Sequence, residues 1–386
     1  MNSKSRIVAG NYRVILQVIA IMVVATPRTM GESSGEVHVE AALERPQLFF
    51  ACCNGEIAAT QALFADGNVI ASLKRLNAGV AIATDDLSPA RAQIVQRLNG
   101  AGIPVVAWFV VPGEQGYYIN SGNAPEAAAH FTAFEQWTEH YRLRWNAVGL
   151  DIEPDIRLFE DLQHHRIRLT TQLLVRYFEF AKVREAREAY SHLIRRIQSQ
   201  GYIVQTYQLP LIVSERKAHL TLLERLLGIV DVRGNEEVVM IYTSFNKALG
   251  PAIIWTLGPS AQTIAIGTTV GGDNALNWDE FSRDLLVAAH FSNNVGIFNL
   301  EGSVEHNYLS RLETMNWHQS VAITSQSIAR ARRLRLVAAI VLWLIELAPL
   351  LFLAMVLALA WAALKFRKRQ KTRRYTLESI QEHTES

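Results

Sequence analysis

Short runs rich in β-branched and aromatic residues alternate with longer runs of helical periodicity between residues 46 and 320. Eight such strand–helix units fit a closed barrel better than an open sheet, and a span of roughly 270 residues is usual for that barrel. An open doubly wound sheet would carry a glycine-rich phosphate turn after its first strand, which Cys52-Cys53-Asn54-Gly55-Glu56 does not provide. We therefore expect an α/β fold, a (β/α)8 TIM barrel. Its predicted strands are Leu48–Cys53, Gly79–Thr84, Pro104–Val111, Ala147–Glu153, Tyr202–Gln208, Val238–Thr243, Thr263–Val270 and Val295–Glu301.

Two apolar segments flank this region. Three cations precede the apolar run Val14–Thr26, whose length is typical of a signal peptide and short for a membrane span, so residues 1–30 are predicted to be a signal peptide or N-terminal anchor. The second run, Leu336–Leu364, contains a single charge, Glu346, and is long enough to cross a bilayer as a helix. We expect a transmembrane helix there.

Charge sets the expected orientation and excludes one class of partner. Four arginines lie in the basic juxtamembrane segment 321–335 or at its end, and seven cations follow the span in the tail 365–386. The excess of cations in the tail predicts a cytoplasmic C-terminus at the cell membrane, with the barrel, residues 46–320, on the extracytoplasmic side. Residues 14–329 hold 24 Lys and Arg against 32 Asp and Glu, so a nucleic acid is not an expected partner.

The fourth predicted strand, Ala147-Val-Gly-Leu-Asp-Ile-Glu153, has the most informative pattern. Alternation places Asp151 and Glu153 on the inner wall at the C-terminal end, where active sites of such barrels lie. Two carboxylates this close favour protonation of one, and we assign the raised pKa to Glu153. A carboxyl group that is neutral near pH 7 is suited to protonating a glycosidic oxygen.

Leu150-Asp151-Ile152-Glu153 resembles the end of the strand-four signature Asp-Gly-x-Asp-x-Asp-x-Glu of the chitinase-like glycoside hydrolases of family 18. Met240-Ile241-Tyr242 resembles the Met-x-Tyr of that family's sixth strand. The resemblance implies a glycan with N-acetylated sugars as substrate, Glu153 as proton donor and Asp151 as the group that orients the acetamide. It also implies that Tyr242 steadies an oxazolinium intermediate in substrate-assisted catalysis.

The sequence departs from that family at three strands. On the fourth, Asn146 and Gly149 replace the first two acids of the motif and Ala147 replaces its glycine. The third strand has Ala107-Trp-Phe-Val-Val-Pro112 in place of Ser-x-Gly-Gly, and the eighth, Gly296-Ile-Phe-Asn-Leu-Glu301, lacks the family's tryptophan. Two alternatives therefore stay open. One is a retaining or inverting glycosidase that uses Glu153 and Glu301 on a plain polysaccharide, and the other is a barrel that binds glycan without cleaving it.

Further polar and aromatic groups follow the predicted strands and are candidates for binding sugar hydroxyls and rings. Glu301 is expected to end strand eight, with Asn299 and Ile297 on its inward side. The predicted substrate-binding residues are Glu301, Asn299, Gln208, Tyr207, Glu114 and Trp108. No His, Asp or Glu set has convincing metal spacing, and no cofactor loop is recognised, so neither a metal nor a cofactor is expected. Cys52 and Cys53 are expected to be free or buried thiols, since bridges between adjacent cysteines are rare.

Overall fold

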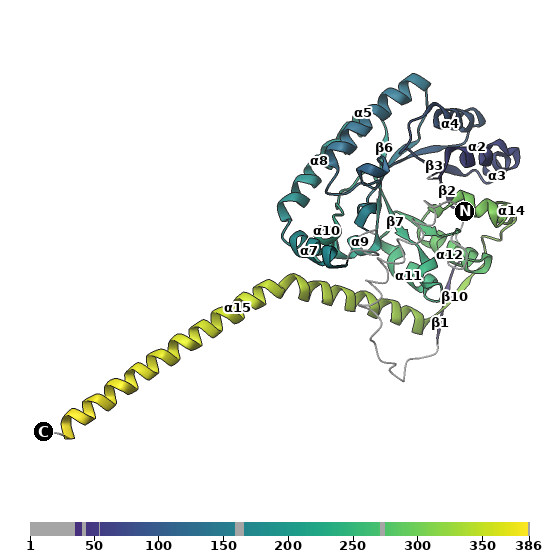
Figure 1. Ribbon diagram of the computed structural model, residues 1–386. Coiled ribbons are helices and arrows are strands. Elements are labelled where there is room, and N and C mark those ends of the chain that lie inside the picture. Colours follow the sequence, from purple (N-terminus) through teal and green to yellow (C-terminus); the bar gives the residue numbers. More distant parts are fainter. Residues whose placement is uncertain (1–34, 41–43, 54, 159–165, 271–274, 385–386) are drawn as a thin grey trace. The chain divides into compact units, whose positions relative to one another are not determined.

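The computed structural model describes residues 35–40, 44–53, 55–158, 166–270 and 275–384 (Figure 1). The predicted signal or anchor segment, residues 1–30, lies outside these residues. Eight parallel strands close into a barrel in the order in which they occur along the chain, so the predicted TIM barrel is confirmed. The strands are β2 (Gln47–Cys52), β3 (Gly79–Ala83), β4 (Val105–Phe109), β5 (Ala147–Asp151), β6 (Ile203–Gln208), β7 (Glu236–Ile241), β8 (Thr263–Gly267) and β9 (Asn294–Phe298).

Helices surround the strands on the outside of the barrel (Figure 1). Between β5 and β6 the chain forms two helices in succession, α7 (Arg166–Arg176) and α8 (Phe180–Ser199), with a break at residues 177–179. Local signals explain where two helices begin: Ser88 caps α4 (Pro89–Ala101) ahead of a proline, and Asn277 and Glu280 form a capping box on α12 (Trp278–Phe291). The helices of the barrel region are α2 (Ile57–Ala65), α3 (Gly67–Arg75), α4 (Pro89–Ala101), α5 (Ala124–Tyr141), α7 (Arg166–Arg176), α8 (Phe180–Ser199), α9 (Pro210–Lys217), α10 (Leu222–Leu227), α11 (Gly250–Leu257), α12 (Trp278–Phe291), α13 (Leu300–Glu305) and α14 (Tyr308–Glu313).

The side chains of β5 divide between two apolar layers as alternation requires. Val148 and Leu150 belong to the large core between the strands and the helices. Ala147 belongs to a smaller cluster inside the barrel, and Asp151 lines a cavity there. The inward and outward faces predicted for this strand are therefore confirmed as far as its last residue, Asp151.

A second sheet and a long helix complete the chain. Strand β1 (Glu36–Val39) pairs antiparallel with β10 (Val321–Thr324), and helix α15 (Ser325–Thr384) begins at the next residue. No sequence pattern predicted this two-stranded sheet. Residues up to Ala338 form one compact unit, and Ala339–Ser386 form another.

The predicted crossing at 336–364 falls within α15, which contains Pro349. In the part of the chain that the structure describes, no helix combines the length and the apolar character needed to cross a membrane. The predicted span is therefore not confirmed.

Candidate active site at the mouth of the barrel

Asp151 ends β5 inside the barrel and is almost fully buried, with 2% of its surface exposed. The indole Nε1 of Trp108, on neighbouring β4, donates a 2.8 Å hydrogen bond to Asp151 Oδ2. The other carboxylate oxygen, Oδ1, is buried without a hydrogen-bond partner. Burial raises the pKa of Asp151 to about 7, and the Trp108 hydrogen bond only partly opposes this rise. Asp151 is thus a carboxyl group that can change protonation state near neutral pH.

A cavity of about 50 Å³ adjoins this carboxyl group. Its walls are largely aromatic and aliphatic: Trp108, Tyr207, Tyr242 and Phe298 line it together with small side chains at the barrel axis. Trp108 and Phe298 meet edge to face, with ring centroids 6.1 Å apart, and Tyr242 lies 5.6 Å from Phe298. The structure therefore brings Asp151, Trp108, Tyr207 and Tyr242 to one site.

Glu153 lies two residues beyond the end of β5 and is also buried, with 2% exposed. Its backbone N–H donates to the carbonyl of Ile119, which links it to the loop that follows β4. Burial raises the pKa of Tyr118 and of Tyr242 well above the ordinary phenol value, and the charges of Glu153 and Asp151 raise both further. Both tyrosines therefore lie within electrostatic reach of the two carboxylates and stay protonated at neutral pH.

A raised pKa is found at Asp151, and the raised pKa predicted for Glu153 stays a prediction. The physical cause is desolvation, since Asp151 has one hydrogen-bonded oxygen and one buried oxygen without a partner. The catalytic roles of Glu153, Asp151 and Tyr242 stay predictions.

Tyr207 and Gln208 end β6 but face opposite sides of the strand. Tyr207 points into the barrel, and its hydroxyl donates to Gln205 Oε1 at 3.0 Å. A Cβ atom at Gly149 would stand 2.8 Å from this ring, so the absence of a side chain there makes room for it. Gln208 instead donates to the carbonyl of Val230 and does not line the cavity. Strand alternation separates these two predicted binding residues.

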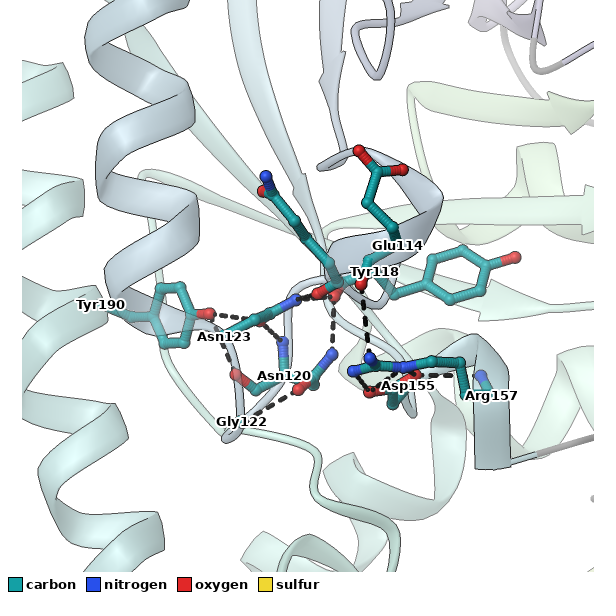
Figure 2. Close-up of polar contacts among 9 residues, drawn as sticks. Glu114, Tyr118, Asn120, Gly122, Asn123, Asp155, Arg157 and Tyr190 are labelled. Atoms are coloured by element: carbon teal, nitrogen blue, oxygen red, sulfur yellow. Dashed lines mark hydrogen bonds and ion pairs between the residues drawn. The ribbon is translucent and has the colours of Figure 1, made fainter. Parts of the chain in front are cut away.

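Polar contacts fix the loop that follows β4, which carries Tyr117 and Tyr118 (Figure 2). The side-chain amides of Asn120 and Asn123 both donate to the carbonyl of Tyr118 at 2.8 Å. Asn123 Oδ1 accepts in turn from the hydroxyl of Tyr190 on α8. The backbone of Tyr118 is therefore fixed by two side-chain amides.

Glu114 lies in a 3-10 turn of the same loop, Gly113–Gln115, and is exposed. Only its backbone carbonyl takes part in the contacts drawn in Figure 2, where it accepts from Arg157. Arg157 also binds Asp155, with 2.9 Å between its Nε and Asp155 Oδ1. The structure thus places the Glu114 carboxylate in solvent at the rim, apart from the residues that line the cavity.

The end of the eighth barrel strand differs from the prediction. Strand β9 stops at Phe298, which faces the barrel interior, whereas Ile297 packs in the outer core. Asn299 caps helix α13 by accepting from the N–H of Gly302, and Glu301 lies in the first turn of that helix. The strand was predicted three residues too long, which reversed its inward and outward faces.

Glu301 does not contact Asp151. It contacts the residue that follows β2, the first strand of the barrel. Its Oε1 accepts a 2.7 Å hydrogen bond from the N–H of Cys53, while Oε2 is buried without a partner. Burial raises the pKa of Glu301, and the Cys53 hydrogen bond and the charge of Arg91 oppose this rise. Glu301 does not line the cavity that contains Asp151.

Cys52 and Cys53 form a disulfide bond, so the expectation of free thiols was wrong. Cys53 adopts a positive φ of 76°, a conformation that brings its side chain back toward that of Cys52. Both cysteines are buried, and the guanidinium of the buried Arg91 donates to the carbonyl of Cys53. Arg91 also lies 3.7 Å from Asp85.

No sequence pattern marks this group, because Arg91 is simply one of two arginines on helix α4. Among the described residues, one set of potential metal ligands lies close together: Cys52, Cys53 and Glu301. The two sulfur atoms are bonded to each other and are not thiolates, the form that binds metals. The expectation that the protein needs no metal or cofactor stays a prediction.

Known proteins resemble the chain only distantly. No family profile and no curated protein matches the sequence. Solved structures that resemble the chain include the glycoside hydrolase domain of PgaB from Bordetella bronchiseptica, at 10% identity over 70% of this chain and 98% of that one, with a TM-score of 0.43. Others are the exo-β-1,4-mannosidase Op5Man5 from an Opitutaceae bacterium (10% identity, 76% and 60% coverage, TM-score 0.38) and the family 5 glycoside hydrolase PbGH5A from Prevotella bryantii (10% identity, 80% and 100% coverage, TM-score 0.37).

A D-allulose 3-epimerase and dihydropteroate synthases resemble the chain to a similar degree. These proteins differ in chemistry, and likeness at this level speaks to the fold alone. The chain is a TIM-barrel protein, and what it does has to be argued from its own site.

Proposed function

We propose that the barrel is a glycoside hydrolase that acts on a glycan with N-acetylated sugars by substrate-assisted acid catalysis. Glu153 donates a proton to the glycosidic oxygen as the bond to the anomeric carbon breaks, and the substrate's acetamide oxygen attacks that carbon. Asp151 orients the acetamide by hydrogen bonding to its N–H, and Tyr242 steadies the oxazolinium intermediate. Water then opens the intermediate and returns a proton to Glu153.

One observation carries this proposal: Asp151 has a buried carboxylate oxygen without a hydrogen-bond partner beside a small, aromatic-walled cavity. A buried acceptor without a donor is costly, and a ligand N–H would satisfy it. The cavity volume of about 50 Å³ gives room for roughly four water-sized groups. An acetamido group has four non-hydrogen atoms, whereas a sugar ring is larger than this space and would have to lie above it.

The alternative that pairs Glu153 with Glu301 is not favoured by the contacts. Glu301 is bound to the N–H of Cys53 and lies within reach of the charge of Arg91, away from the cavity lining. A nucleophile needs an unobstructed approach to the anomeric carbon.

Hydrolysis of chito-oligosaccharides by the native chain and by Glu153→Gln tests the proposal. The amide cannot donate the proton, so we expect the rate to fall by roughly 10²- to 10⁴-fold while the fold is retained. Glu139→Gln, on the exposed surface of α5, is a matched control that should keep the native rate. Full activity in Glu153→Gln would refute the mechanism, and tight binding of the oligosaccharide with no product would indicate a non-catalytic glycan receptor.

We further propose that the chain is held at the cell membrane through residues 336–364, with the barrel on the extracytoplasmic side and residues 365–386 in the cytoplasm. The support is the sequence: a 29-residue segment with one charge, followed by seven cations. Protease treatment of intact cells tests the orientation. Digestion should remove the barrel and protect an epitope tag fused after Ser386, and protection of the barrel would contradict the proposal.

A further inference from the structure

A second cavity, of about 240 Å³, lies outside the barrel next to the C-terminal end of β7. Its walls come from the start of α9, the residues that end and follow β7, helix α11 and the first turns of α15. Apolar side chains dominate these walls, among them Leu209, Ile253, Leu257 and Leu334. By volume it holds roughly twenty water-sized groups, which is enough for an extended hydrocarbon chain.

Arg335 is the one charged side chain among the described residues that line this cavity. Its Nη1 donates to the carbonyl of Thr256, and its Nε is buried without a hydrogen-bond partner. In the part of the chain that the structure describes, no carboxylate pairs with it. A partly buried guanidinium without an anion is unfavourable, so the apolar cavity is complementary to a ligand that brings a negative charge.

The cavity adjoins the candidate active site. Met240 and Tyr242 line both this cavity and the smaller one that contains Asp151. A chain seated here would therefore contact one wall of the site from outside the barrel.

We propose that this cavity binds the hydrocarbon chain of a single-chain anionic lipid, whose carboxylate pairs with the guanidinium of Arg335. The chain packs against α11 and the first turns of α15, and the charge stays at the Arg335 end. Fatty acids provide this combination of one chain and one carboxylate. The proposal does not depend on the glycosidase activity, because it rests on the composition of the cavity alone.

Photo-crosslinking of the full chain in lipid nanodiscs tests this site. The probe is a palmitate analogue with a diazirine in the middle of its chain, and an analogue with an alcohol in place of the carboxylate serves as the neutral comparison. After irradiation, labelled peptides are mapped by mass spectrometry. We expect the palmitate probe to label α11 at residues 253–257 and to label it roughly tenfold more than the alcohol does, because only the acid can form a charge-assisted hydrogen bond.

Two variants separate the site from general lipid contact. Arg335→Gln should reduce labelling of α11 by the acid roughly tenfold and leave labelling by the alcohol unchanged. Arg332→Gln removes an exposed charge from the same helix, outside the cavity, and should leave both unchanged. Labelling confined to the exposed apolar residues of α15, or equal labelling by acid and alcohol in the native chain, would overturn the proposal. The comparison of acid with alcohol in the native chain needs no variant, so it tests the proposal even if Arg335→Gln does not fold.

Discussion

Among the buried carboxylates at the mouth of the barrel, Asp151 and Glu301 have different surroundings. Asp151, between β4 and β6, receives one hydrogen bond from the Trp108 side chain and faces a cavity. Glu301, beside β2, receives its hydrogen bond from the backbone of Cys53 and lies within reach of the charge of Arg91. Desolvation raises the pKa of both groups. Burial therefore does not distinguish a reactive carboxylate from a structural one here, and the difference lies in what each group faces.

The comparison assigns different tasks to the two sides of the mouth. Around Asp151, residues of β4, β5, β6 and β7, together with Phe298 of β9, leave a carboxylate oxygen and several aromatic rings toward a space that a ligand can enter. The side formed by β9, β2 and β3 joins strand ends through the hydrogen bonds that Glu301 and Arg91 make with the backbone of Cys53. We interpret the first as the site of chemistry and the second as a clamp that fixes the strand ends.

The largest expected effect is on the rate of hydrolysis, which should depend on Asp151 much more than on Glu301. Asp151→Asn should lower the rate of chito-oligosaccharide hydrolysis about 10²-fold or more, because the neutral amide cannot accept from the acetamide N–H in the same way. Glu301→Gln should change the rate by only a few fold. Steady-state kinetics on both variants measures this contrast. Equal losses would show that the two groups work as one unit.

Arg91→Met should have the largest effect on stability. The substitution removes the guanidinium that donates to the carbonyl of Cys53 and lies near the carboxylate of Asp85. The carbonyl and the carboxylate then lose this buried cation. Loss of one partner from such a group costs about 3 kcal/mol of unfolding free energy. Arg97→Met, on the exposed side of the same helix, is the control and should cost little. Chemical denaturation checks both, and similar stability of the two variants would argue against a clamp.

The pH dependence of stability should identify Asp151. Its pKa is about 7 in the folded chain, well above the ordinary aspartate value. As pH rises from about 4 to 7, the unfolded chain releases this proton while the folded chain retains it, so the free energy of unfolding falls over that range and then levels. Asp151→Asn should make this part of the profile flatter. Thermal melts from pH 4 to 8 measure it, and an unchanged slope would mean that Asp151 has an ordinary pKa.

The smallest effect is expected from removing the disulfide. It closes a ring between adjacent residues, so it restricts the unfolded chain very little. Replacing Cys52 and Cys53 together with alanine should cost about 1 kcal/mol or less from that source. The hydrogen bond from the residue 53 N–H to Glu301 does not depend on the sulfur atoms. Denaturation of the double variant tests this, and a large loss would assign the clamp to the disulfide.

The barrel and one half of its mouth were predictable from the sequence. Strand–helix alternation determined the fold, and the period-two pattern of Ala147–Asp151 placed Asp151 on the inner wall. The β9 side was not predictable. In the sequence, Asn299 and Glu301 continue the alternating strand pattern, but in the structure the strand has already ended and Asn299 caps helix α13. The contact of Arg91 with Cys53 joins residues far apart in sequence, and no local pattern marks it.

The sheet formed by β1 and β10 determines where a mechanical force applied to the chain would act first. Glu36 pairs with Thr324, and the N–H of Ser325 donates to the carbonyl of Gly35, so the chain enters and leaves the barrel region at one point. A pull applied through the residues before Gly35 and a pull applied through α15 would load the same pair of strands. Either pull would load this pair of strands ahead of β5, the strand that ends at Asp151.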